Sequence, residues 1–157
     1  MLELTDLTKT FEKGTVNEQT ALDGITLSVA DGDFITILGS NGAGKSTLFG
    51  AIAGSFWPDR GHILLDGEDI TYLPEYRRAR RIGILFQDPL KGTAPDMTIA
   101  ENLALAYTRG RRFPLARALQ RRDVDFLRER LAAFGMGLED RMNTKVGLLS
   151  GGQRQAM

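Results

Sequence analysis

Residues 39–47 read Gly-Ser-Asn-Gly-Ala-Gly-Lys-Ser-Thr, which satisfies the spacing G-x-x-x-x-G-K-[ST] in full. An apolar run from Phe34 to Leu38 precedes them, and Leu48 and Ile52 recur after them at helical spacing before Gly54. The pattern therefore predicts a strand, a glycine-rich loop and a helix. Glycines let such a loop curl with its N–H groups turned inward, and a helix start adds free amides and a positive dipole end. We expect this loop to bind a polyphosphate.

Different residues of the loop are expected to bind different parts of a nucleotide. Lys45 is placed to reach the β and γ phosphates, and the hydroxyl of Ser46 is placed to bind Mg²⁺. Thr47 is one residue further along and can donate to the α phosphate. The candidate nucleotide-binding residues of this loop are Gly39, Ser40, Asn41, Gly42, Ala43, Gly44, Lys45, Ser46 and Thr47.

Composition indicates an ordinary globular protein. The chain has 157 residues, 42% of them apolar, and its 20 Lys and Arg balance 20 Asp and Glu, which argues against a surface built wholly for nucleic acid or anionic lipid. The absence of Cys excludes a disulfide framework and a thiolate metal site, and is compatible with a reducing compartment. No run of about 18 apolar residues predicts a membrane span.

Strand signals dominate the first half of the chain. Residues 1–14 alternate between apolar and polar and predict a strand. Ala30 to Asp33 predict a hairpin turn between strands at 25–29 and 34–38. A further strand is expected before the turn at Asp66-Gly67, and the apolar run from Ile82 to Phe86 predicts a strand buried on both faces.

Helical signals dominate the second half. Thr98 and Glu101 have the spacing of a capping box and predict a helix start. Between Pro114 and Phe134, apolar positions that step by three and four predict an amphipathic helix. This change of composition places a predicted boundary near residue 90.

The segment Leu149-Ser150-Gly151-Gly152-Gln153 resembles the signature motif of ATP-binding cassette (ABC) ATPases, and residues 39–47 resemble their Walker A loop. Gln87, in ILFQDP, stands where that family has its Q-loop glutamine. These motifs occur in the family's order and span essentially the whole chain. The resemblance implies an α/β P-loop NTPase fold, with an N-terminal antiparallel β region, a RecA-like core and a helical subdomain. Residues 1–90 are then the β region and P-loop core, and residues 91–157 the Q-loop and helical subdomain.

The same resemblance implies further contacts with ATP. Phe11 occupies the aromatic position that stacks on adenine, although the sequence supports a core position in the first sheet equally well. Gln87 joins Ser46 as a Mg²⁺ ligand. The signature residues act in trans on the γ phosphate of a second subunit in a head-to-tail dimer, and they are Ser150, Gly151, Gly152 and Gln153. As candidate catalytic residues the resemblance implies Gln87, together with Ser150 and Gly152 acting in trans, and no others.

Several family features have no counterpart in residues 1–157. A Walker B strand ending in Asp-Glu, a D-loop and a switch histidine are absent, and the only histidine, His62, is expected to lie on a strand surface. The chain is therefore expected to bind ATP better than it hydrolyses it. We expect it to be the N-terminal part of a longer ATPase, and whether it is itself an enzyme stays open.

The resemblance also implies partners. It predicts an ATP-binding subunit of an ABC transporter that couples ATP binding and hydrolysis to import of amino-acid-type solutes. Separate transmembrane permease subunits would contact residues 87–98, with the chain cytoplasmic and peripheral on the inner face of the membrane. The arginines near 77–81 and 109–112 are read as solvated faces, so no nucleic acid is expected. Two alternatives stay open: a nucleotide-binding module without turnover, and a soluble ABC ATPase acting on nucleic acid, which salt-sensitive binding would reveal.

Overall fold

The computed structural model describes residues 1–109 and 121–157, which form two compact units, Met1–Ile82 and Gly83–Met157. Each unit is described by itself. The division into residues 1–90 and 91–157 stays a prediction. No helix within the two described stretches is long and apolar enough to cross a membrane.

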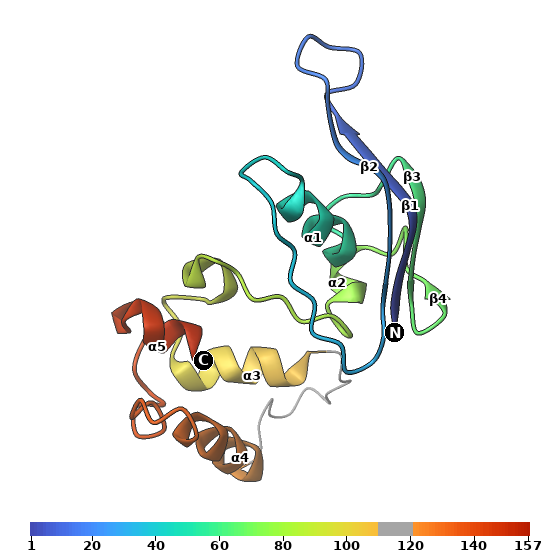
Figure 1. Cartoon of the computed structure of the whole chain (residues 1–157). Coiled ribbons are helices and arrows are strands. Elements are labelled where there is room, and N and C mark those ends of the chain that lie inside the picture. Colours follow the sequence, from blue (N-terminus) through green and yellow to red (C-terminus); the bar gives the residue numbers. More distant parts are fainter. Residues whose placement is uncertain (110–120) are drawn as a thin grey trace. The chain divides into compact units, whose positions relative to one another are not determined.

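The first unit is built on an antiparallel sheet with the strand order β2-β1-β3-β4 (Figure 1). The strands are β1 (Leu2–Phe11), β2 (Gln19–Val29), β3 (Arg60–Leu65) and β4 (Glu68–Asp69). The strand predicted from the first residues is therefore confirmed as β1. The predicted turn between β3 and β4 is also present, with positive φ angles of 53° at Asp66 and 78° at Gly67.

Helix α1 (Lys45–Ala53) packs on one face of this sheet, and the short helix α2 (Glu75–Arg78) follows β4. As predicted, α1 ends at Gly54, whose φ of 87° lets its N–H donate to the carbonyl of Gly50 at 3.0 Å. The buried core is shared between sheet and helix, and it consists of Leu4, Leu7, Leu22, Leu48, Ala51, Ile63 and Ile70.

The second unit is helical. Its elements are η1 (Pro89–Gly92), α3 (Ile99–Thr108), α4 (Arg121–Ala132), η2 (Val146–Leu148) and α5 (Gly151–Gln155). The capping box predicted at the start of α3 is formed, because Thr98 Oγ1 accepts from the Glu101 amide at 3.2 Å and Glu101 accepts from the Thr98 amide at 2.7 Å. The core of this unit consists of Ile99, Leu103, Leu127, Leu131, Leu138, Met142, Val146 and Leu149.

Two predicted strands are wrong. The turn predicted at Ala30–Asp33 is present, because the Asp33 amide donates to the Ala30 carbonyl at 3.2 Å, but the predicted hairpin is not formed. Residues 34–38 and 82–86 make no strand pairing with any other described residue. Their apolar side chains are largely exposed, with Phe34 at 94% and Leu85 at 77%. The reason is that apolar, β-branched runs favour an extended backbone, whereas a strand exists only where a neighbour satisfies its N–H and C=O groups.

The amphipathic helix is confirmed over α4, where Leu127 and Leu131 are buried. Residues 114–120 of that prediction lie outside the described part of the chain. Phe134 does not join the apolar face as predicted, because α4 ends at Ala132 and the Phe134 side chain is 57% exposed. The turn that follows carries Gly135 at a φ of 62°, which redirects the chain.

The arginine-rich stretch after α2 is not uniformly solvated. Arg78 is only 2% exposed, and its guanidinium donates solely to backbone carbonyls, while burial lowers its pKa. Arg81 is paired with Asp66 and Glu68. Only Arg77 and Arg80 remain exposed without a carboxylate partner among the described residues, which reduces the predicted patch to two cations. Arg111 and Arg112 fall outside the described residues.

Candidate functional site

The glycine-rich loop between residues 39 and 44 is shaped by two residues in the left-handed region. Gly42 has a φ of 84° and Gly44 a φ of 81°. A Cβ on Gly44 would lie 2.3 Å from the carbonyl oxygen of Ala21 in β2, so only glycine lets the loop approach this strand. The loop is therefore fastened to the sheet immediately before α1 begins.

Lys45, the first residue of α1, turns back over this loop. Its ammonium donates to the carbonyl of Gly39 at 2.7 Å and to that of Ser40 at 2.6 Å. The cation thus lies at the loop rather than out in solvent. Because both partners are uncharged carbonyls, the charge of Lys45 is not neutralised by them, and it is available to a phosphate.

The start of α1 has the features of an anion site. Within the described residues, no side chain caps its first turn and no acidic residue lies in that turn. By contrast, α3 and α5 both begin with a capping box. The exposed hydroxyl of Ser46 makes no hydrogen bond in the part of the chain that the structure describes. Free amides, a cation and a free hydroxyl therefore meet here, and this set fits a nucleotide polyphosphate with Mg²⁺.

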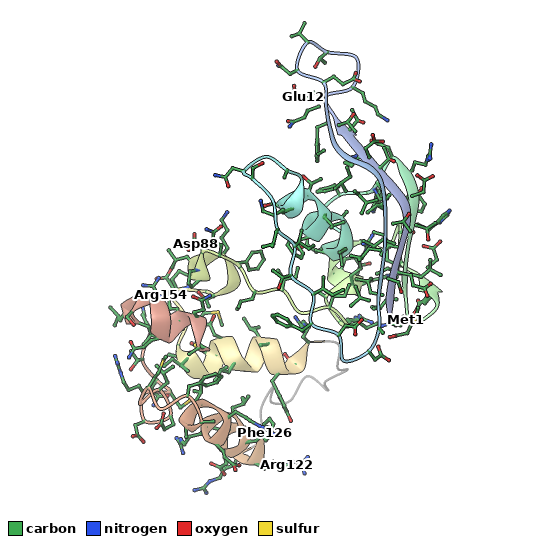
Figure 2. All side chains as sticks on the ribbon, in the orientation of Figure 1. Met1, Glu12, Asp88, Arg122, Phe126 and Arg154 are labelled. Atoms are coloured by element: carbon green, nitrogen blue, oxygen red, sulfur yellow. The ribbon has the colours of Figure 1, made fainter. Side chains whose placement is uncertain are left out.

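Phe11 lies at the end of β1, where the chain enters the loop of residues 12–18 that projects beyond the sheet (Figure 2). Its side chain is 37% exposed and it is absent from the buried core of the unit. The Phe56 ring meets it edge-on, with ring centroids 5.4 Å apart and planes inclined by 78°. The position is compatible with a face open to a base, and stacking on adenine stays a prediction.

Lys9 and Asp59 support this aromatic pair. The Lys9 ammonium lies 5.5 Å from the Phe11 centroid and 5.6 Å from the Phe56 centroid, and it donates to the carbonyl of Trp57 at 2.9 Å. The amide of Thr10 donates to Asp59 at 2.7 Å, and this bond, with the nearby lysines, lowers the pKa of the Asp59 carboxyl. The carboxylate therefore ties the end of β1 to the segment that leads into β3.

Phe56 and Lys9 were not singled out from the sequence. Lys9 and Phe11 stand two apart on a strand and so share a face, and this spacing alone could have predicted that their side chains are neighbours. Nothing in the sequence brings Phe56 to the same place, because that depends on where the chain turns after α1.

Gln87 belongs to the second unit and lies exposed at a bend. It directly precedes Asp88, whose carboxylate accepts from the Leu90 amide at 3.0 Å and caps η1. Ser46 lies in the first unit, so a shared role of Ser46 and Gln87 in binding Mg²⁺ stays a prediction.

The segment from Ser150 to Gln153 opens α5. Ser150 Oγ accepts from the Gln153 amide at 3.3 Å, and the Ser150 amide donates to Gln153 Oε1 at 3.1 Å. A Cβ on Gly151 or Gly152 would meet nothing within 4 Å, so both glycines face open space. Contact of these residues with a phosphate stays a prediction.

His62 lies on β3, exposed as expected, with Nδ1 3.2 Å from a carboxylate oxygen of Asp69. Across residues 1–109 and 121–157, no group of three or more His, Cys, Asp or Glu side chains is arranged to hold a metal.

Comparison with known proteins gives one consistent result. A family model described as ABC transporter matches residues 22–157. A tyrosine transport ATP-binding protein of Clostridioides difficile is 39% identical over 157 residues, which cover 100% of this chain and 62% of that protein. A sulfate/thiosulfate import ATP-binding protein of Caulobacter vibrioides is 38% identical over 137 residues, covering 86% of this chain and 38% of that protein. The chain thus spans less than two thirds of the length of these relatives.

A solved structure of an ATP-binding cassette, a dimer in a post-hydrolysis state bound to ADP and phosphate, has the same fold. The TM-score is 0.77 at 29% sequence identity, over 99% of this chain and 66% of that one. The expected P-loop NTPase fold with an antiparallel N-terminal sheet is therefore confirmed.

Proposed function

The chain belongs to the ABC transporter family, and we propose that it is the ATP-binding part of such a transporter, with the loop of residues 39–47 as its phosphate site. The observation that carries the proposal is the position of Lys45. Its ammonium lies on the loop carbonyls beside an uncapped helix start, where an anion can replace those carbonyls as its partner. Charge-assisted bonds to phosphate are stronger than bonds to neutral carbonyls, so phosphate oxygens should displace the loop carbonyls from the Lys45 ammonium.

The remaining roles follow from the positions of this chain's own residues. The amides of residues 42–47 would bind the phosphates, and Lys45 would neutralise part of their charge. The Ser46 hydroxyl would hold Mg²⁺, and Gln87 would complete the coordination. Mg²⁺, when bound, supplies charge compensation on the phosphate oxygens. Phe11 would stack on the base.

We propose that two copies of the ATP-binding part close head to tail, so that the segment 150–153 of one copy contacts the γ phosphate held by the other. Support comes from the dimeric solved cassette of the same fold and from the open space above Gly151 and Gly152. Capping of α5 by Ser150 holds these two glycines at a fixed helix start.

The transport role rests on the relatives, which are named as transport and import ATP-binding proteins. We propose that separate permease subunits dock near residues 87–98, which would place the chain at the inner face of the membrane. Identity of 39% with a tyrosine transport protein favours uptake of an amino-acid-type solute. Import driven by ATP hydrolysis is then the activity of the assembled transporter.

Isothermal titration of the chain with Mg-ATP tests the phosphate site. Lys45→Ala should weaken binding about a hundredfold, because the substitution removes a charge that faces the phosphates. Lys91→Ala is the matched control, since this lysine lies in η1 of the second unit, and it should leave ATP affinity unchanged. Equal affinity of wild type and Lys45→Ala would rule the site out.

A further inference from the structure

Phe56 connects the two ends of the proposed nucleotide site. Its ring lies against α1 at Gly50, where an added Cβ would stand only 2.8 Å from Phe56 Cε1. The ring therefore rests on bare helix backbone, at a position that any larger residue would block. The same α1 carries Lys45 and the free amides at its start.

The Phe56 ring also meets Phe11. The two rings form an edge-to-face pair with centroids 5.4 Å apart, a preferred geometry for aromatic pairs. Phe11 itself stands at the end of β1, is 37% exposed and lies outside the buried core of the unit. Among the described residues, its ring contacts are the aromatic ring of Phe56 and the ammonium of Lys9.

Lys9 completes the arrangement. Its ammonium lies within 5.6 Å of both ring centroids and is anchored by the Trp57 carbonyl, with Asp59 at 3.5 Å. A cation shared by two rings favours the conformer in which the rings converge on it. The pair is therefore held from the α1 side by Gly50 and from the strand side by Lys9.

From this geometry we infer that Phe56 is a positioning residue, which fixes the ring of Phe11 relative to α1 so that base and phosphates are bound at once. The inference rests on the proposed function, because it requires Phe11 to stack on the base. It makes a separable demand: Phe56 should matter for nucleotide and not for inorganic polyphosphate, which has no base.

The experiment compares Mg-ATP with magnesium tripolyphosphate by isothermal titration of the whole chain. Stacking of one base on an aromatic ring changes affinity about tenfold, so Phe56→Ala should weaken ATP by about that factor. Tripolyphosphate affinity should change less than twofold. Gly50→Ala, which displaces the ring without removing it, should act in the same direction. If circular dichroism shows that Phe56→Ala does not fold, the ATP and tripolyphosphate affinities of Gly50→Ala test the inference instead.

A double substitution separates positioning from general support. In a Phe11→Ala background, adding Phe56→Ala should cause no further loss of ATP affinity, because the residue it positions is gone. Additive losses, or equal losses for ATP and tripolyphosphate, would overturn the inference. Failure of the proposed function would give a different titration result, because the wild-type chain would bind neither ATP nor tripolyphosphate, or Lys45→Ala would bind both with wild-type affinity.

Discussion

Replacement of Arg78 by Ala should destabilise the first unit more than any other single arginine substitution in that stretch. The guanidinium donates to the carbonyls of Leu73 at 2.8 Å, Ala51 at 2.6 Å, Ile52 at 3.0 Å and Thr71 at 2.7 Å. Two of these carbonyls belong to the last turn of α1, which lacks intrahelical donors. A single side chain therefore binds the free carbonyls at the end of α1 and links them to the segment after β4.

The magnitude follows from the buried bonds. Those to Ala51 and Thr71 lie in buried surroundings, and a buried acceptor left without a partner costs about 1–3 kcal/mol. Two such carbonyls cost about 2–6 kcal/mol, and water that enters the vacated space offsets a part. We expect a loss of about 3 kcal/mol in the free energy of unfolding, which lies in the range for broken buried networks.

Urea unfolding followed by Trp57 emission measures this loss. Trp57 is the single tryptophan of the chain, and its ring packs edge-on against Tyr72, so its emission reports on the first unit. With a slope of about 1.5 kcal/mol per molar, the midpoint of Arg78→Ala should fall by about 2 M.

The neighbouring Arg80 supplies the matched control, because it is exposed and its side chain makes no hydrogen bond or ion pair within the described residues. Arg80→Ala should shift the free energy of unfolding by less than about 0.5 kcal/mol. Arg78→Lys keeps the charge but replaces the planar fork by one nitrogen, so it should lose stability to an intermediate extent. Equal midpoints for Arg78→Ala and Arg80→Ala would refute the reasoning.

Three further substitutions test other parts of the structure. Gly44→Ala should reduce Mg-ATP affinity at least tenfold in a titration, since its Cβ would meet the Ala21 carbonyl at 2.3 Å and displace the loop. Thr98→Ala should lower the free energy of unfolding by about 1 kcal/mol in urea, because the capping bond to the Glu101 amide is lost. Asp59 has a lowered folded-state pKa, so its stabilisation is present above its ordinary value of 3.8 and is lost as pH falls below it. The drop in unfolding midpoint between pH 5 and pH 3 should be smaller in Asp59→Asn than in wild type, and an identical drop would contradict the role of this carboxylate.

Features fixed by neighbours in sequence were predicted well. The Thr98 capping box, the turn at Asp66-Gly67 and the stop of α1 at Gly54 each need only a few adjacent residues, and each is present. The start of α1 directly after the glycine-rich loop also belongs to this group, whereas phosphate binding by that loop stays a prediction. The resemblance of residues 149–153 and 39–47 to family motifs led to the correct family for the same reason.

Features that depend on distant partners were not predictable. Whether the runs at 34–38 and 82–86 become strands is decided by a neighbouring backbone, which their own composition does not reveal. Arg78 reads as one of four surface arginines, and only the return of the chain past α1 buries it. The meeting of Phe56 with Phe11 likewise depends on how α1 ends and β3 begins.

The extended segment Phe34-Ile35-Thr36-Ile37-Leu38 has a consequence for how the chain behaves at high concentration. It is uncharged, rich in β-branched residues and free of proline, and most of its side chains are exposed. Exposed segments of this kind form β-pairs with the same segment of other molecules and nucleate ordered aggregates. We expect turbidity to rise steeply with protein concentration, and Thr36→Lys to suppress it. A bound nucleotide would restrain one end of this segment through the loop that follows it, so ligand should also slow the assembly.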